Sequence, residues 1–276
     1  MMNRLSRTDK RLYNETGYVT IDLGLSLDEL KELRQDTLRL AAAPPKKQEG
    51  YEYSDSPRVF EGWKYSKAIC NLALNRRVLE TIECLHDWPN FRPFQTINFT
   101  CASNQPLHSD DIHFSSEPKG KMVGVWVALE DANEKNGALQ VVPKSHKMPY
   151  ISMKDVTGSD QPLEYGKHFN AYAQYESYVR GLLRSSEPPT SVSVPAGTAI
   201  IWHANLLHGG TPIPDSSSPP SRLSQATHYY AEADCYYSPL FSSESRSEYS
   251  LKDLSGKDFK DESNYEHDTR GLGETS

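Results

Sequence analysis

The chain has 276 residues, of which 37% are hydrophobic and 24% charged, and its net charge at pH 7 is −7. No run of Lys and Arg is long enough to neutralise a nucleic-acid backbone, so we expect no nucleic-acid partner. No stretch approaches the roughly 18 apolar residues of a membrane span, so we also expect no membrane partner.

The cysteines are few and far apart, and none forms a C-x-x-C pair. This spacing predicts reduced thiols in a cytoplasmic protein rather than a disulfide scaffold or a zinc site. The first residues also lack the apolar run of a secretion signal. We expect one domain over residues 1–250, followed by a charged, flexible tail over 251–276. The four cysteines are Cys70, Cys84, Cys101 and Cys235.

The segment before residue 90 predicts helices and a single strand. A short strand is expected over 17–22, followed by a helix that begins after Ser26, where the pattern S-x-x-E is a capping box. Apolar residues recur at helical spacing in this helix, although Thr37 interrupts them. Residues 42–60 predict a loop, and residues 65–86 predict a second helical stretch.

From Phe91 onward the pattern predicts short strands bounded by Pro, Gly or Asn. Such a series predicts a mainly β fold, a sandwich or barrel, here preceded by helices. The expected strands are 95–100, 107–114, 122–129, 138–142, 191–194, 198–203 and 223–231.

An insert over residues 148–190 interrupts this series of strands. Part of it is expected to be helical, and we expect the insert to form part of a lid over the substrate. At least half of its aromatic residues are expected to serve packing instead. These residues are Tyr165, Phe169, Tyr172, Tyr175 and Tyr178.

His108 and Asp110 form the first candidate for chemistry. On a strand, residues i and i+2 share a face, so these two side chains would point together while Asp111 points away. One imidazole beside one carboxylate is two-thirds of the 2-His-1-carboxylate site that holds non-haem Fe(II). An isolated H-x-D is common by chance and alone indicates no function.

Two further places carry suitable side chains. His203 and His208 compete for a ligand role, and the two glycines after His208 would permit close approach to it. Arg222 and Ser224 share a strand face, and a guanidinium with a hydroxyl suits a carboxylate. Taken alone, each histidine is better explained by a structural role than by a ligand role. Arg222, taken alone, is better explained by a surface ion pair than by a carboxylate site.

The order of these groups is more informative than any one of them. H-x-D, a histidine about 100 residues later and an arginine 14 residues after that are arranged as in Fe(II)/2-oxoglutarate dioxygenases. Between them stand W-x-A-L-x-D (126–131), N-G-x-L (136–139) and V-P-x-S-H (142–146). Residues 12–235 thereby resemble the phytanoyl-CoA dioxygenase family. The resemblance implies a double-stranded β-helix (jelly-roll, cupin-like) core with flanking helices.

The resemblance also implies roles for individual residues and a set of cofactors. His208 is preferred to His203 because the family's distal ligand precedes a glycine and lies shortly before the arginine. His146 is not a ligand candidate, and His228 is expected to make a core hydrogen bond or to reach toward the site. The implied cofactor is Fe(II), with 2-oxoglutarate and O2 as cosubstrates. The implied iron ligands are His108, Asp110 and His208, and the implied 2-oxoglutarate contacts are Arg222, Ser224 and Trp126.

The expected activity is hydroxylation of an unactivated C–H bond, with release of succinate and CO2. No Lys/Arg cluster suggests a CoA-diphosphate site, so a small organic molecule or natural-product intermediate is the expected substrate. A cupin-like metal isomerase or lyase is an alternative, but it would not need Arg222 with Ser224. A non-catalytic small-molecule-binding member of the fold is another, but it would not need an intact ligand set.

Overall fold

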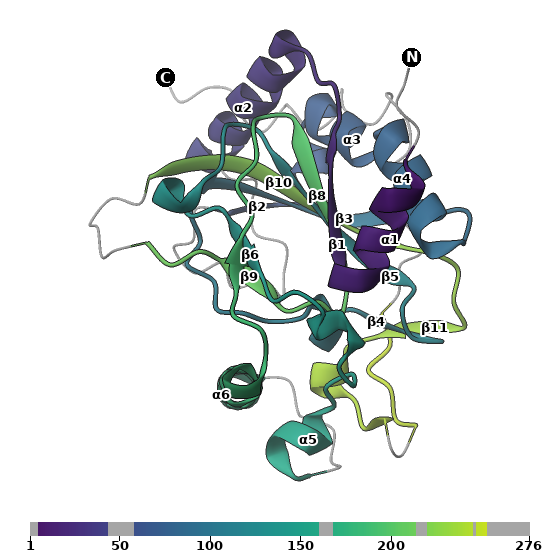
Figure 1. Cartoon of the computed structure of the whole chain (residues 1–276). Helices are drawn as coiled ribbons and strands as arrows, with labels where there is room; N and C mark the ends of the chain where they lie inside the picture. The colour runs from purple at the N-terminus through teal and green to yellow at the C-terminus, as the bar shows by residue number, and fades with distance from the viewer. Residues whose placement is uncertain (1–4, 44–57, 160–167, 214–219, 245–246, 253–276) are drawn as a thin grey trace, which may run out of the picture.

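Figure 1 shows the protein as a computed structural model, which describes residues 5–43, 58–159, 168–213, 220–244 and 247–252. Three expectations fall outside these residues: the tail beyond residue 252, the contacts of Tyr165 and those of the Phe169 side chain.

A six-stranded antiparallel sheet forms the centre of the fold, in the order β1-β8-β5-β10-β3-β2. One of its two central strands, β5, is buried along its whole length. A strand covered on both faces has no polar positions, which explains the continuous apolar run of its sequence. The bounds are β1 Tyr18–Asp22, β2 Arg58–Phe60, β3 Arg92–Cys101, β5 Met122–Ala128, β8 Thr198–His203 and β10 Ser221–Tyr230.

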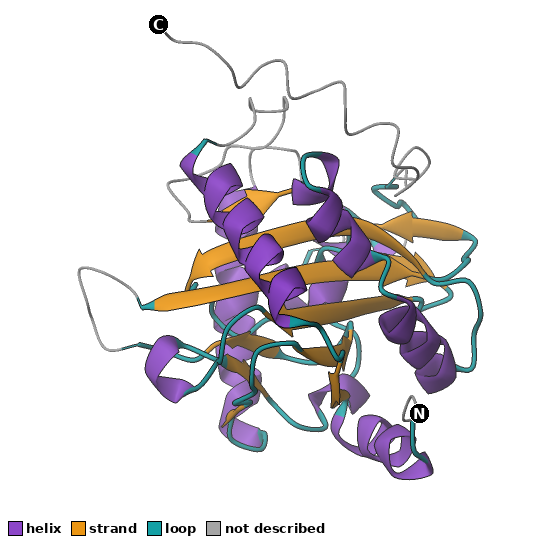
Figure 2. Cartoon of the chain, turned by 90° about the horizontal axis from the view of Figure 1, so that it is seen from above, coloured by secondary structure: helices purple, strands orange, loops and turns teal. Residues whose placement is uncertain are grey.

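Alternate residues of β5 belong to two different cores. Val123, Val125 and Val127 pack with the N-terminal helices, which cover one face of the sheet (Figure 2). Trp126 and Ala128 pack on the other face, against a three-stranded sheet of order β7-β6-β9. The smaller sheet consists of β6 Leu139–Val141, β7 Thr190–Ser191 and β9 His208–Gly210.

The helices over the large sheet begin where the sequence supplies caps. Ser26 forms the predicted capping box of α2. Thr37 is fully buried in this helix and accepts a hydrogen bond from Asn98 of β3, so the polar residue belongs to the docked face. The helices are α1 Arg7–Thr16, α2 Leu27–Ala42, α3 Lys67–Ala73 and α4 Arg76–His86.

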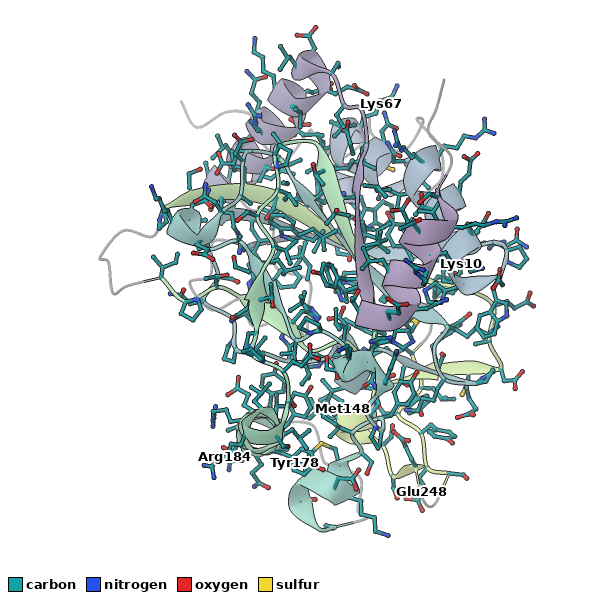
Figure 3. The ribbon with its side chains drawn as sticks, in the orientation of Figure 1. Lys10, Lys67, Met148, Tyr178, Arg184 and Glu248 are labelled. Atoms are coloured by element: carbon teal, nitrogen blue, oxygen red, sulfur yellow. The ribbon has the colours of Figure 1, made fainter. Side chains whose placement is uncertain are left out.

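The insert supplies two helices at the opposite end of the molecule from α2 (Figure 1). They are α5 Met153–Thr157 and α6 His168–Leu182, so the expectation of helix in the insert is confirmed. Figure 3 marks this end by Tyr178 and Arg184. A further pair, β4 Ser115–Glu117 and β11 Cys235–Tyr237, leads into a C-terminal segment with a 3-10 helix at Pro239–Phe241.

The fold is therefore mainly β, with flanking helices around a jelly-roll core, as predicted. Within the described part of the chain, no helix is long and apolar enough to span a membrane.

The structure differs from the sequence expectation at four places. Residues 65–86 form two helices rather than one, because the Asn75 side chain caps a new helix by accepting from two backbone N–H groups. Residues 44–57 of the expected loop 42–60 lie outside the described residues, and its last three residues form strand β2. The expected strand 191–194 is reduced to β7 with an isolated bridge at Val194, and helix α1 was not expected.

The expected strand 107–114 is also wrong. His108 makes one isolated bridge, and the chain then turns into a 3-10 helix at Asp110–Ile112. Ser and Asp favour turns because their side chains compete for nearby backbone groups. Asp111 still points away from Asp110, as predicted, but the turn directs it toward the Ser115 hydroxyl and Lys119.

Candidate active site

His108 and His208 lie opposite each other as an antiparallel bridge, exchanging both backbone hydrogen bonds at 2.9 Å. Their ring centroids are 4.6 Å apart. Gly209 permits this approach, because a Cβ there would lie 2.6 Å from the Gln105 carbonyl oxygen. The pairing of the H-x-D loop with β9 thus brings together two histidines that are 100 positions apart.

Asp110 completes the group from the first turn of the 3-10 helix. Its Oδ1 lies 3.8 Å from His108 Nε2 and 3.5 Å from His208 Nε2. All three side chains are buried, and one ligand atom from each lies within 4.8 Å of the others. The arrangement has the donor set of a 2-His-1-carboxylate metal site.

Both imidazoles are preset to offer Nε2 to a metal. His108 Nδ1 lies 2.9 Å from the Pro106 carbonyl oxygen, and His208 Nδ1 lies 2.9 Å from that of Leu206. A carbonyl only accepts, so each Nδ1 carries the proton and each Nε2 presents a lone pair.

The electrostatics favour neutral imidazole beside ionised carboxylate. Burial, with the neighbouring His208, lowers the pKa of His108 to about 3. Burial alone would raise the pKa of Asp110, but the neighbouring imidazoles of His208 and His228 hold it well below its usual range. These are the protonation states that metal ligands require.

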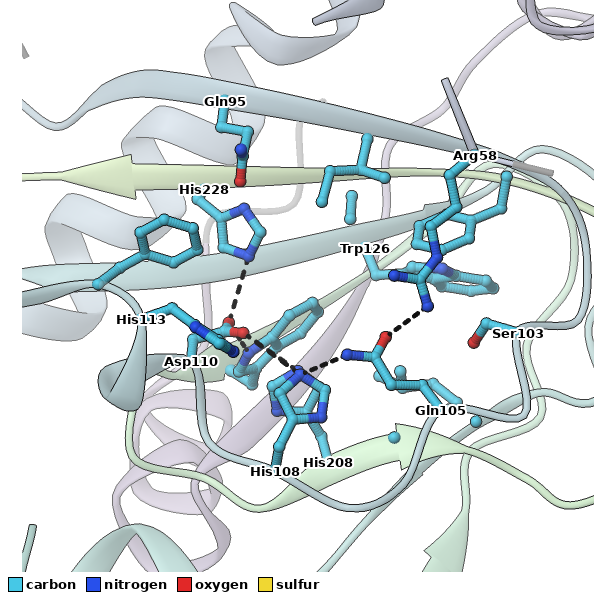
Figure 4. A pocket seen from close by; sticks show the side chains of 18 of the residues that line it. Arg58, Gln95, Ser103, Gln105, His108, Asp110, His113, Trp126, His208 and His228 are labelled. Atoms are coloured by element: carbon cyan, nitrogen blue, oxygen red, sulfur yellow. Dashed lines mark hydrogen bonds and ion pairs between the residues drawn. The ribbon is translucent and has the colours of Figure 1, made fainter. Parts of the chain in front are cut away.

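The three side chains border a cavity of about 360 Å³ (Figure 4). At one end lie two guanidiniums, Arg58 and Arg222, whose Cζ atoms are 5.4 and 5.6 Å from the centroid of the Phe99 ring. Within the described chain neither has a carboxylate partner, and the Nε of each is buried without a hydrogen bond. Burial lowers the pKa of Arg222 to about 10, which leaves it charged at neutral pH.

Trp126 and Ser224 take different positions at this end. Trp126 lines the cavity, with the Arg222 Cζ 5.6 Å from its ring centroid. Ser224 is fully buried and donates to the Arg222 carbonyl oxygen at 3.4 Å, and it is not among the residues that border the cavity.

The opposite end of the cavity is aromatic and mostly uncharged. Its lining includes Phe114, Phe241 and the imidazoles of His113 and His228. Lys252 is the only cation among the described residues at this end. No described residue of the insert lines the cavity. Instead, the Tyr175 hydroxyl of α6 accepts a hydrogen bond from the backbone N–H of Ser109, which lies between His108 and Asp110.

Of the other histidines the sequence singled out, His203 lies away from the site and His228 lies beside it. His203 stacks on His86 and lies near His146, at centroid distances of 6.1 and 5.7 Å, so His208 rather than His203 joins Asp110. His228 does reach the site, with Nε2 3.4 Å from Asp110 Oδ2.

Sequence reasoning did not find Arg58, Gln105 and Trp202. Arg58 donates to the Gln105 side-chain oxygen at 3.1 Å, and the Gln105 amide donates to His108 Nε2 at 3.1 Å. Trp202 Nε1 donates to Asp110 Oδ2 at 2.9 Å. Only the alternation of β8, which places Trp202 on the same face as Ile200, could have hinted at the last contact.

Comparison with protein families decides the class. Residues 13–217 match the family model described as phytanoyl-CoA dioxygenase (PhyH). The chain belongs to the phytanoyl-CoA dioxygenase family. As a member of this family, it is an oxidoreductase that depends on Fe(II) and 2-oxoglutarate and uses O2.

Individual relatives and structures agree with this family. Peroxisomal phytanoyl-CoA dioxygenase of Rattus norvegicus is 23% identical over 257 residues, covering 85% of this chain and 71% of the relative. The 2-oxoglutarate-dependent carbocyclase SnoK from nogalamycin biosynthesis has a TM-score of 0.64 at 18% identity, covering 85% of this chain and 87% of that one. EctD from S. alaskensis with bound Fe has a TM-score of 0.60 at 19% identity, covering 82% and 76%.

Proposed function

We propose that this family member hydroxylates an unactivated C–H bond of a small organic molecule, with Fe(II) held by His108, Asp110 and His208. The observation that carries the proposal is the buried triad, in which both imidazoles direct an unprotonated Nε2 toward an ionised carboxylate. A donor set of two imidazoles and one carboxylate with open positions is typical of non-haem Fe(II) oxygenases.

We further propose that 2-oxoglutarate places its distal carboxylate at Arg222, with Arg58 nearby. Buried Nε donors without a partner fit such a carboxylate, because an unpaired buried donor is costly and a charge-assisted hydrogen bond would satisfy it. Trp126 would flank the cosubstrate, and Ser224 would act through the backbone of Arg222.

The bound iron and cosubstrate supply the oxidising power: O2 is divided between succinate and the hydroxylated product, with loss of CO2. The protein contributes placement and shielding. Arg58 lies on one side of the triad and His113 and His228 lie on the other (Figure 4), so the cosubstrate and the substrate can approach the triad from opposite sides. The buried surroundings of His108 and His208 keep bulk water from the ligands.

The aromatic end supports a small, largely uncharged substrate. A cavity of about 360 Å³ is near the lower limit for ligand pockets, roughly 300 Å³, and it must also hold the cosubstrate. One cation, Lys252, does not make the cluster expected for a CoA diphosphate. SnoK, which shares this fold, comes from nogalamycin biosynthesis, and this supports a natural-product intermediate as substrate.

The proposal is tested by incubating the anaerobically reconstituted protein with Fe(II), 2-oxoglutarate and air, with and without candidate substrates. Succinate and a product one oxygen heavier are expected. An Arg222→Leu variant should raise the KM for 2-oxoglutarate by about 10- to 150-fold, the equivalent of roughly 1.5–3 kcal/mol for a hydrogen bond to a charged group. The surface variant Arg76→Leu, whose side chain is 89% exposed, is the matched control. Iron binding without succinate under any condition would refute oxygenase activity.

We also propose the cytoplasm as the compartment. All four cysteines are free thiols, which suits a reducing environment. Fractionation of the source cells tests this assignment.

A further inference from the structure

The two oxygens of Asp110 have different surroundings. Oδ1 faces His108 and His208, and lies 3.5 Å from His208 Nε2. Oδ2 faces away from those two imidazoles, and lies 2.9 Å from Trp202 Nε1 and 3.4 Å from His228 Nε2. Two N–H donors therefore converge on the oxygen that does not face the ligand cluster.

Trp202 reaches Asp110 because β5 makes room for its ring. Gly124 is the register partner of Trp202 across the β5–β8 ladder. A Cβ on Gly124 would lie 2.3 Å from Trp202 Cε2, a distance that no side chain tolerates. The glycine thus lets the indole lie over β5 with its N–H directed at Asp110.

His228 is oriented by its own cross-strand partner. Its Nε2 faces an ionised carboxylate, so that nitrogen carries the proton and Nδ1 is an acceptor. Nδ1 and the Gln95 side-chain oxygen are both buried without a partner, and the two residues are opposite each other in the β3–β10 register. Gln95 points toward the imidazole (Figure 4). A half-turn of the amide would direct its N–H₂ donor toward Nδ1.

We propose that His228 and Trp202 are positioning residues that hold Oδ2 of Asp110 away from the metal, so that the carboxylate binds through Oδ1 alone. This inference rests on the proposed iron site. A carboxylate can bind a metal through one or both oxygens. Binding through both would fill one of the open positions that 2-oxoglutarate and O2 require, and two donors on Oδ2 prevent that.

The test measures metal binding to the whole protein by anaerobic Fe(II) titration calorimetry, and coordination number by the visible absorption of the Co(II)-substituted protein. His228→Leu and Trp202→Phe should each weaken Fe(II) binding by about 10- to 100-fold, as is typical for residues that orient a metal ligand. Both should also change the intensity of the Co(II) bands as Oδ2 joins the metal. His228→Gln keeps an N–H donor and should restore most of the affinity and the parent spectrum. His146→Leu makes the same change at a half-buried histidine outside the cavity and should alter neither readout.

The outcomes distinguish the inference from the function on which it rests. Wild-type protein that binds no Fe(II) refutes the proposed function itself. Wild-type binding with unchanged affinity and spectrum in His228→Leu and Trp202→Phe overturns the positioning role, and so does a His228→Gln variant as impaired as His228→Leu. If His228→Leu does not fold, Trp202→Phe decides between the two results. A lower melting temperature with an unshifted Co(II) spectrum means that the residues are merely structural, and this also overturns the inference.

Discussion

Lys119 offers a quantitative prediction, because its largely buried charge links Asp111, next to Asp110, to Glu244 in the C-terminal segment. Its Nζ lies 3.5 Å from Asp111 Oδ2, 3.2 Å from Glu244 Oε1 and 3.0 Å from the Ser115 hydroxyl. The side chain of Asp111 is only 3% exposed. Burial raises the pKa of Asp111 to about 6 even with the Lys119 charge beside it. Removing the ammonium therefore strands a carboxylate that water cannot reach.

Replacing Lys119 by Met should lower the free energy of unfolding by about 3 kcal/mol, the lower end of the range for breaking a buried pair, since Lys119 is itself 21% exposed. The control is Lys144→Met. Lys144 pairs with Glu187, but the two side chains are 58% and 48% exposed and solvent screens the pair, so this loss should be much smaller. Urea unfolding of the metal-free protein measures both values. Equal losses in the two variants would refute the argument that burial makes the Lys119 contact strong.

Three further predictions concern other parts of the molecule. Tyr175→Phe removes the acceptor of the buried Ser109 N–H and should cost about 1–3 kcal/mol of unfolding free energy, whereas Tyr178→Phe should cost less; equal costs in urea unfolding would contradict this. Phe241→Ala enlarges the aromatic end of the cavity, so steady-state assays should show a larger rise in the KM for substrate than in that for 2-oxoglutarate, and the reverse order would be inconsistent with that end binding substrate. Burial lowers the pKa of His86 to about 4, so below pH 6.5 the unfolded chain takes up a proton at this residue that the folded chain does not. Between pH 7.5 and 5 the His86→Gln variant should therefore lose about 2 kcal/mol less unfolding free energy than the wild type. Parallel profiles of unfolding free energy against pH would show that burial does not lower the pKa of His86.

The parts of the fold that the sequence predicts well are those with local periodicity. The strand 122–129 matches β5 to within one residue, and the capping box at Ser26 begins α2 where expected. Thr37 interrupts the apolar pattern of α2, and its place on the buried face is explained only by its hydrogen bond with Asn98 of β3. Hydrogen bonding between distant segments can reverse what a local pattern suggests.

The site shows the same division. The grouping of His108, Asp110 and His208 could be predicted because their order and the glycine after His208 follow a family motif, although the strand expected to carry the first two is a bridge followed by a turn. Arg58 could not be found, because it follows an aperiodic segment and meets the site only through tertiary packing. Trp202 looked like ordinary core, since an indole in an apolar strand gives no sign that its N–H has a carboxylate partner.

The most direct test of the central claim is Fe(II) binding by variants of His208 and His203, two histidines five positions apart in the sequence. His208→Ala should abolish stoichiometric Fe(II) binding and succinate formation, because it removes one of the three proposed ligands. His203→Asn should retain both, since His203 stacks on His86 outside the cavity. Iron binding that survives in His208→Ala and is lost in His203→Asn would contradict the site described above.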